Sequence, residues 1–168
     1  MKNIIGLFVI LAFSVAAFGQ QSKAKPLAET FSATALDGES FSLAELKGKV
    51  VVLTFWSTKC PICHSEIPKL NKLAETYQDK AVVFLGLTME NQDKVRAYLK
   101  KTPFKFDILP NSFGVVLKYA DKDGDGNVAM GFPAHFLINQ KGEIELKTGG
   151  FDKTELLDSR INQLLNSK

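Results

Sequence analysis

The chain has 168 residues, of which 45% are hydrophobic and 23% charged, and its formal net charge is +3 at pH 7. This length suits one globular domain with its own core, and the composition is close to that of soluble globular proteins. Lysines and acidic residues are interspersed. Nucleic acid is therefore not an expected partner, because binding it needs a clustered cationic surface.

The first residues have the pattern of a secretory signal peptide. Lys2 precedes an apolar run over 4–18, and the small residue Gly19 follows. A positive start, an apolar centre and a small-residue exit are typical of a segment that is cleaved on export, and the run is shorter than the roughly 20 apolar residues of a membrane-spanning helix. The predicted organisation is a signal peptide over 1–19, a flexible leader over 20–26 and a single domain over 27–168. An uncleaved segment that tethers the protein to a membrane is the alternative.

Apolar periodicity predicts strands that alternate with helices. Alternation around Asp37-Gly38 predicts a β-hairpin over 31–41, and the β-branched run 50–56 predicts a strand buried on both faces. Residues 60–77 and 153–165 carry apolar side chains on one helical face. The other predicted elements are a turn of helix over 42–46, a strand over 81–87, a helix over 91–101, a strand over 104–109, a helix over 112–119, a turn-rich loop over 121–127, and paired strands over 136–139 and 143–147. This order predicts an α/β fold with a mixed sheet.

The two cysteines, Cys60 and Cys63, are separated by only two residues. A structural disulfide usually closes a longer loop, because longer loops restrict the unfolded chain more. Cys60 follows the predicted strand 50–56 and begins the predicted helix, where unpaired amides and the helix dipole stabilise a thiolate. Lys59 adds a cation beside it. We therefore predict that Cys60 is the exposed nucleophile and that Cys63, one turn along the helix, is the shielded resolving thiol.

The sequence around this pair resembles the exported TlpA/ResA-like thiol–disulfide oxidoreductases of the thioredoxin superfamily. The motifs that carry the resemblance are the approach 41–49, Trp56 before the CxxC pair, Glu66-x-Pro68 after it and the segment 131–139. The resemblance extends over most of the chain after the leader. It implies a thioredoxin-like fold, which is a central mixed β-sheet flanked by helices, with an N-terminal hairpin extension and a central helix–strand insertion.

The resemblance also implies roles for individual residues. Glu66 matches the family's acid near the redox pair, which helps to move protons, and Pro133 matches the cis-proline that faces the disulfide. Phe132 would offer backbone hydrogen bonds to an extended client segment. The expected client-binding residues are Trp56, Pro61, Ile62, Phe132 and Pro133. No metal or organic cofactor is implied besides the redox-active Cys60–Cys63 disulfide.

Four positions depart from the family pattern. Lys59 stands where a tryptophan often precedes the first cysteine, and Thr54 stands where cytoplasmic thioredoxins carry a buried aspartate. Glu66 is therefore the remaining candidate for proton transfer. The intervening pair Pro61-Ile62 differs from the common Gly-Pro, and because this dipeptide affects how oxidising the pair is, the reduction potential stays open.

The expected function is thiol–disulfide exchange outside the cytoplasm, in the direction of client reduction. A membrane thiol carrier would supply electrons, and the clients would be disulfide-containing exported proteins, including apocytochromes in cytochrome c biogenesis. A monomer is expected. Two alternatives stay open. One is a peroxiredoxin-like thiol peroxidase, although Leu53 and Ser57 replace the proline and threonine of that motif. The other is a non-catalytic module of the same fold that binds a partner strand.

Other ligand motifs have weaker support. The spacing CxxCH, which ends at His64, is also that of covalent c-type haem attachment. A zinc site needs four ligands, and the other histidine, His135, lies in an apolar strand as a predicted core residue. Residues 121–127 copy the start of a calcium loop, but its twelfth position is Phe132 instead of glutamate. We expect a solvated acidic turn there.

Overall fold

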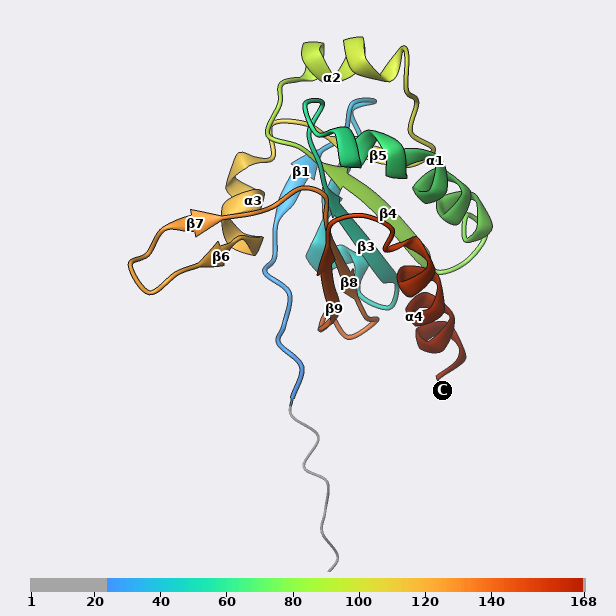
Figure 1. Cartoon of the computed structure of the whole chain (residues 1–168). Coiled ribbons are helices and arrows are strands. Elements are labelled where there is room, and N and C mark those ends of the chain that lie inside the picture. The colour runs from blue at the N-terminus through green and yellow to red at the C-terminus, as the bar shows by residue number, and fades with distance from the viewer. Residues whose placement is uncertain (1–23, 168) are drawn as a thin grey trace, which may run out of the picture.

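The computed structural model of the chain describes residues 24–167, so the predicted signal peptide over 1–19 lies outside the described residues. The elements in chain order (Figure 1) are β1 (Ser32–Thr34), β2 (Ser40–Ser42), the 3-10 turn η1 (Leu43–Leu46), β3 (Val50–Phe55), α1 (Pro61–Thr76), β4 (Val82–Leu87), α2 (Gln92–Leu99), β5 (Asp107–Leu109), α3 (Phe113–Tyr119), β6 (Asp121–Lys122), β7 (Val128–Ala129), β8 (Ala134–Ile138), β9 (Ile144–Gly149) and α4 (Thr154–Asn166). Between residues 24 and 167, no helix is long and apolar enough to cross a membrane.

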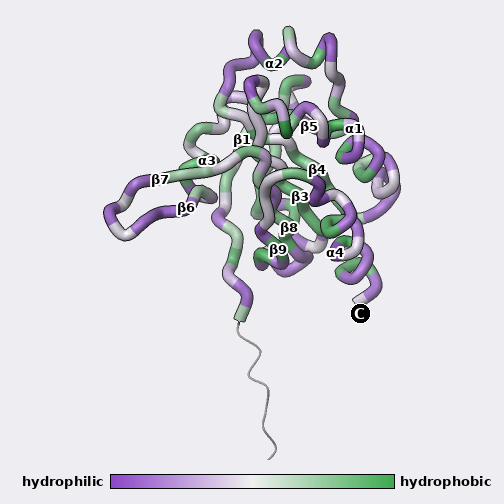
Figure 2. Tube along the Cα trace, in the orientation of Figure 1, coloured by the Kyte–Doolittle hydropathy of each residue, from purple (hydrophilic) through white to green (hydrophobic). Residues whose placement is uncertain are grey.

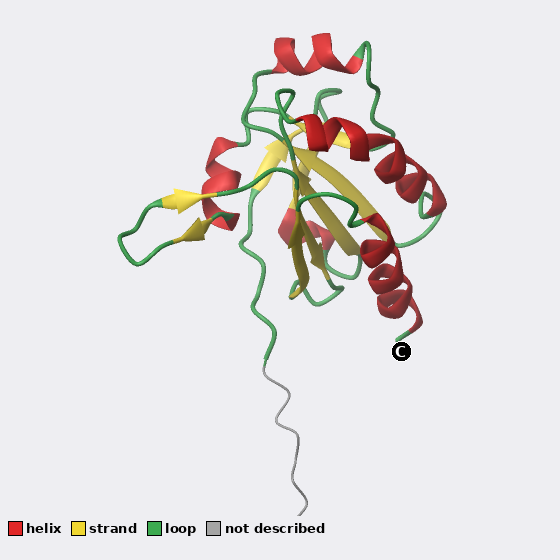
Figure 3. Cartoon of the chain, viewed as in Figure 1, coloured by secondary structure: helices red, strands yellow, loops and turns green. Residues whose placement is uncertain are grey.

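Five strands form the central sheet in the order β5-β4-β3-β8-β9. The strands β3, β4 and β5 run parallel, whereas β8 and β9 are antiparallel to their neighbours. The N-terminal hairpin β1–β2 is a separate two-stranded sheet, and α2 with β5 forms the helix–strand insertion between β4 and α3 (Figure 3). The predicted α/β thioredoxin-like fold with a mixed central sheet is confirmed.

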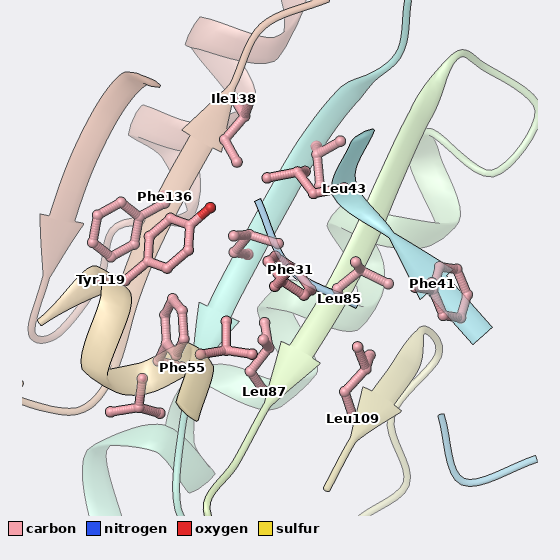
Figure 4. Close-up of a cluster of buried hydrophobic side chains, with 14 of the residues drawn as sticks. Phe31, Phe41, Leu43, Phe55, Leu85, Leu87, Leu109, Tyr119, Phe136 and Ile138 are labelled. Atoms are coloured by element: carbon pink, nitrogen blue, oxygen red, sulfur yellow. The ribbon is translucent and has the colours of Figure 1, made fainter. Parts of the chain in front are cut away.

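The central strand β3 is buried along its whole length, as its β-branched run predicts. Val50 and Val52 pack against α1 and α4 on one face of the sheet. Val51, Leu53 and Phe55 face the N-terminal hairpin and α3 on the other, in the cluster drawn in Figure 4. Figure 2 shows the same pattern as an apolar sheet beneath more polar helix surfaces. Both faces of β3 are thus covered by apolar side chains, which holds the strand rigidly.

Two predicted elements differ from the structure. The strand expected over 104–109 is shorter, because the side chain of Asn71 in α1 donates to the Pro103 carbonyl at 2.9 Å and accepts from the Lys105 amide at 2.8 Å. These bonds tie the preceding residues to α1 instead of to the sheet. The expected loop 121–127 lies within the short hairpin β6–β7, which extends away from the sheet (Figure 1).

The sheet brings three segments to one edge. Phe55 pairs with Leu87 of β4 on one side and with Ala134 of β8 on the other. The residues that follow β3 and β4 therefore meet each other there, and they also meet the residues that precede β8. The Trp56 amide, which donates to the Leu87 carbonyl at 3.1 Å, continues the pairing beyond β3. The carboxyl ends of parallel strands are the usual place for a site in this class of fold.

The packing of α4 predicts different effects for two adjacent leucines. Leu157 is fully buried against the sheet, whereas Leu156 is 40% exposed. Leu157→Ala should lower the free energy of unfolding by about 2–5 kcal/mol because it leaves a cavity. Leu156→Ala should change the same quantity by less than about 0.5 kcal/mol. Urea denaturation measures both values, and equal losses would contradict this placement of α4.

Candidate redox-active site

The two cysteines lie at the start of α1 and form a disulfide, with their Cα atoms 5.2 Å apart. Cys60 is the N-cap residue, in an extended backbone conformation, and its Sγ accepts a hydrogen bond from the Cys63 amide at 3.1 Å. Pro61 occupies the first helical turn, where its missing N–H costs nothing. Cys60 is partly exposed, whereas Cys63 is only 3% exposed. One sulfur is therefore open to another molecule and the other is shielded.

A loop that is distant in sequence faces this disulfide. The Phe132–Pro133 peptide bond is cis, and the Phe132 carbonyl oxygen lies 3.5 Å from the Sγ of Cys60. Pro133 is buried and Phe132 is partly exposed. Phe132 and Pro133 also line a groove of about 470 Å³, together with Gly149 and Gly150 among other residues. The structure thus brings both residues of the expected client-binding loop to the redox pair.

The remaining expected client-binding residues divide into two groups. Pro61 and Ile62 are exposed at the start of α1, with Ile62 43% exposed, so both are accessible to a client. Trp56 is only 1% exposed, and its ring packs against Phe104 and Tyr98 at centroid distances of 4.7 and 5.4 Å. The expectation that Trp56 contacts the client therefore does not fit its position, because the aromatic side chains of the insertion cover it. Its position supports the motif from beneath.

Glu66 lies on α1 one turn after Cys63, and its carboxylate is 1% exposed. It accepts hydrogen bonds from the backbone amides of Asp152 and Lys153, just before α4 begins, and lies 3.3 Å from Nε2 of His135. Burial alone would raise the pKa of Glu66, but the interactions with His135 and with the two amides outweigh it and lower the pKa below its ordinary value. The carboxylate is therefore ionised at neutral pH.

His135 is fully buried in β8, as the apolar strand around it predicts, but it is also hydrogen-bonded. Its Nδ1 lies 3.1 Å from the Thr54 hydroxyl, and its Nε2 faces Glu66. The network Thr54–His135–Glu66 thus links β3, β8 and α1. This network was not predicted from the sequence. Its signal was a polar residue in each of two apolar strands, and pairing of the strands places Thr54 opposite His135.

A second carboxylate, which sequence analysis also missed, lies on the other side of the motif. Glu90, in the loop after β4, accepts hydrogen bonds from the Thr58 amide at 2.9 Å, from the Thr58 hydroxyl at 2.7 Å and from the hydroxyls of Ser57 and Thr88. The Lys94 ammonium lies 3.1 Å away. Burial raises the pKa of Glu90, but these donors outweigh it and lower the pKa to about 2. Its position in the sequence could have indicated this contact, because Glu90 follows β4, which runs parallel to β3 and ends beside it.

The structure gives other partners to the residues of the haem and metal motifs. The sulfurs of the CxxCH motif are joined in a disulfide, and Nε2 of His64 lies 3.0 Å from the Thr58 carbonyl oxygen. Asp123 of the acidic turn accepts hydrogen bonds from the amides of Asp125 and Asn127, which close the β6–β7 hairpin. Among residues 24–167, no group of three or more His, Cys, Asp and Glu side chains could hold a metal ion.

This arrangement can carry out thiol–disulfide exchange. Cys60 occupies the N-cap of α1, before the first amides of the helix, and these amides would favour a negative charge on its Sγ once the disulfide is reduced. Its exposed side lies open to a second sulfur atom. Cys63 lies close enough to attack the Cys60 sulfur from within the protein, since the two sulfurs are bonded in the oxidised form.

Comparisons with known proteins agree with this chemistry. Residues 25–147 match the AhpC/TSA family. The chain is 35% identical over 133 residues to the thioredoxin-like protein YneN of Bacillus subtilis (strain 168). This alignment covers 77% of the chain and 74% of the relative. It is 28% identical over 138 residues to the thiol-disulfide oxidoreductase ResA of Bacillus thuringiensis subsp. konkukian (strain 97-27). This alignment covers 82% of the chain and 76% of the relative.

A solved structure supports the same relationship. The thiol:disulfide interchange protein of the thioredoxin family from Chlorobium tepidum TLS is similar with a TM-score of 0.73 at 26% identity. The match covers 86% of this chain and 99% of that protein. The chain therefore belongs to the AhpC/TSA family and is a ResA-like thiol–disulfide oxidoreductase of the thioredoxin superfamily.

Proposed function

We propose that this oxidoreductase works outside the cytoplasm and reduces disulfides of exported client proteins. The observation that carries the proposal is the Cys60–Cys63 disulfide at the exposed start of α1, beside the Phe132–Pro133 loop. The signal-peptide pattern of residues 1–19 supports export, and a disulfide-forming pair suits an oxidising compartment. The direction of electron flow rests on the resemblance to the TlpA/ResA-like proteins.

The reaction proceeds in two exchange steps. The Cys60 thiolate attacks one sulfur of a client disulfide, the client S–S bond breaks, and the second client sulfur leaves as a thiolate. The Cys63 thiolate then attacks Cys60, which forms the Cys60–Cys63 disulfide and releases the first client sulfur. Two electrons pass from the protein to the client, and the two client thiolates take up protons. A membrane thiol carrier restores the dithiol form through the reverse exchange.

Exposed groups would bind the client, and a buried group would transfer the proton. The exposed Pro61 and Ile62 and the carbonyl of Phe132 would hold an extended client segment next to Cys60. Glu66 would accept the thiol proton of Cys63, because its carboxylate is ionised and lies one turn further along the same helix. Apocytochromes and other disulfide-containing exported proteins are the proposed clients, and the protein would act as a monomer. The protein would need no metal or organic cofactor besides its redox-active disulfide.

Replacing the resolving cysteine should trap the first intermediate. Cys63→Ser, in its reduced form, should accumulate a mixed disulfide with insulin through Cys60, because no internal thiol remains to release it. Non-reducing gels and mass spectrometry detect this adduct, and Cys60→Ser is the matched control that should form none. Insulin reduction unaffected by either substitution would contradict the proposal. Hydrogen peroxide consumed faster than insulin disulfide is reduced would favour the thiol peroxidase instead.

Replacing the buried acid should slow the second step in a pH-dependent way. Glu66→Gln keeps the shape but cannot take a proton, so release of the mixed disulfide at pH 7 should slow by about 100-fold. Because the pKa of Glu66 is lowered, the wild-type rate should fall only when the pH drops below the ordinary range of a glutamate. The rate of Glu66→Gln should instead rise with pH towards the thiol pKa.

Acid quench after mixing with oxidised glutathione, followed by mass spectrometry, measures this rate. Glu143→Gln is the matched control, because Glu143 accepts a hydrogen bond from Asn139 at the β8–β9 turn, away from the disulfide. Its rate and pH profile should equal those of the wild type. A Glu66→Gln profile that coincides with the wild type would show that Glu66 does not handle the proton.

A further inference from the structure

The loop between β3 and α1 carries Cys60. In this loop the amide, the hydroxyl and the carbonyl of Thr58 are all hydrogen-bonded. Glu90 accepts from the Thr58 amide at 2.9 Å and from the Thr58 hydroxyl at 2.7 Å. The Thr58 carbonyl lies 3.0 Å from Nε2 of His64. Because a carbonyl oxygen can only accept, this nitrogen carries the hydrogen and donates it. We call Glu90 and His64 together the Thr58 clamp.

The clamp reaches the cysteine through Ser57. The Ser57 hydroxyl donates to Glu90 at 3.1 Å and accepts from the Lys59 amide at 3.1 Å. The Ser57 carbonyl in turn accepts from the Cys60 amide at 3.1 Å. Hydrogen bonds to the Glu90 carboxylate and to the Ser57 hydroxyl and carbonyl thus fix the backbone from Ser57 to Cys60.

Each half of the clamp is itself anchored in a rigid element. Glu90 is held by the buried Thr88 hydroxyl at 2.8 Å and by Lys94 of α2. The His64 ring belongs to α1 and packs against Tyr98 of α2 at a centroid distance of 4.9 Å. The loop is therefore tied to the segment after β4, to α1 and to α2 at the same time, independently of the disulfide.

We propose that Glu90 and His64 are positioning residues that keep Cys60 within bonding distance of Cys63 when the pair is reduced. The inference rests on the proposed function, because it concerns the resolving step of the same exchange. In the dithiol form no covalent bond holds the two sulfurs together. A fixed loop raises the effective concentration of the Cys63 thiolate at the Cys60 sulfur. The clamp thereby speeds release of the client and favours the internal disulfide over a mixed one.

Three single substitutions test the clamp from different sides. Thr58→Val removes the hydroxyl and leaves the Glu90 charge, His64→Phe keeps the packing on Tyr98 but removes the donor, and Glu90→Gln removes the charge. Thr58→Val and Glu90→Gln should each shift the equilibrium with a glutathione buffer towards the dithiol by about tenfold, as expected for the loss of a hydrogen bond to a charged group. His64→Phe should shift it in the same direction by about fivefold, because the bond it removes has a neutral acceptor. Release of glutathione from its mixed disulfide with Cys60 should slow by a similar factor.

Tyr77→Phe is the matched control. It removes a part-buried hydrogen bond of 2.5 Å from Tyr77 to Asp158, which joins α1 to α4 away from the loop. It should leave both the equilibrium and the release rate at wild-type values, although it lowers the free energy of unfolding. Circular dichroism verifies that each variant is folded, and Thr58→Val serves as the decisive variant if His64→Phe does not fold.

The outcomes separate the clamp from its alternatives. Wild-type values for Thr58→Val and His64→Phe, with a shift only for Glu90→Gln, would show an effect of charge alone and would overturn the clamp. A shift in Tyr77→Phe as large as in the loop variants would overturn it as well, because general loosening would then suffice. Insulin reduction by the wild type is measured in parallel. Its absence would count against the proposed function, whereas an unshifted equilibrium with normal insulin reduction would count against the clamp alone.

Discussion

The site depends on the hydrogen bond from the Cys63 amide to the Sγ of Cys60 at the first turn of α1. This bond requires Cys60 to lie at the N-cap, where the backbone is still extended and the helix amides are unpaired. The buried strand β3 lies at the centre of the sheet and ends five residues before Cys60. A reactive sulfur is thus placed by the most rigid part of the fold.

Two carboxylates flank this sulfur pair, and their surroundings give them different functions. Glu66 is buried with His135 and with two amides that precede α4, so it joins the redox helix to the C-terminal helix, and proton transfer from Cys63 is its proposed role. Glu90 is saturated by hydroxyl, amide and ammonium donors and is fixed as an anion. The role that we propose for Glu66 is therefore proton transfer, and the role that we propose for Glu90 is positioning.

The sequence predicted those features that repeat along the chain or lie close together in it. The buried strand β3, the helix α1 and the CxxC pair follow from periodicity and spacing, and the mixed sheet follows from element order. Contacts between distant segments left no such pattern. The Glu90 contacts, the pairing of Thr54 with His135 and the Asn71 bonds that shorten β5 each join residues more than one element apart. The burial of Trp56 depends on the insertion, whose packing no local pattern specifies.

The titration of the two thiols in the reduced protein shows whether the start of α1 stabilises a thiolate at Cys60. The rate of iodoacetamide alkylation at each cysteine, measured against pH and read by mass spectrometry, gives the pKa of each thiol. We expect Cys60 to react first and with a pKa below the ordinary cysteine value of about 8.5, while Cys63 stays protected. A Cys60 pKa at or above that value, or faster alkylation of Cys63, would contradict this expectation.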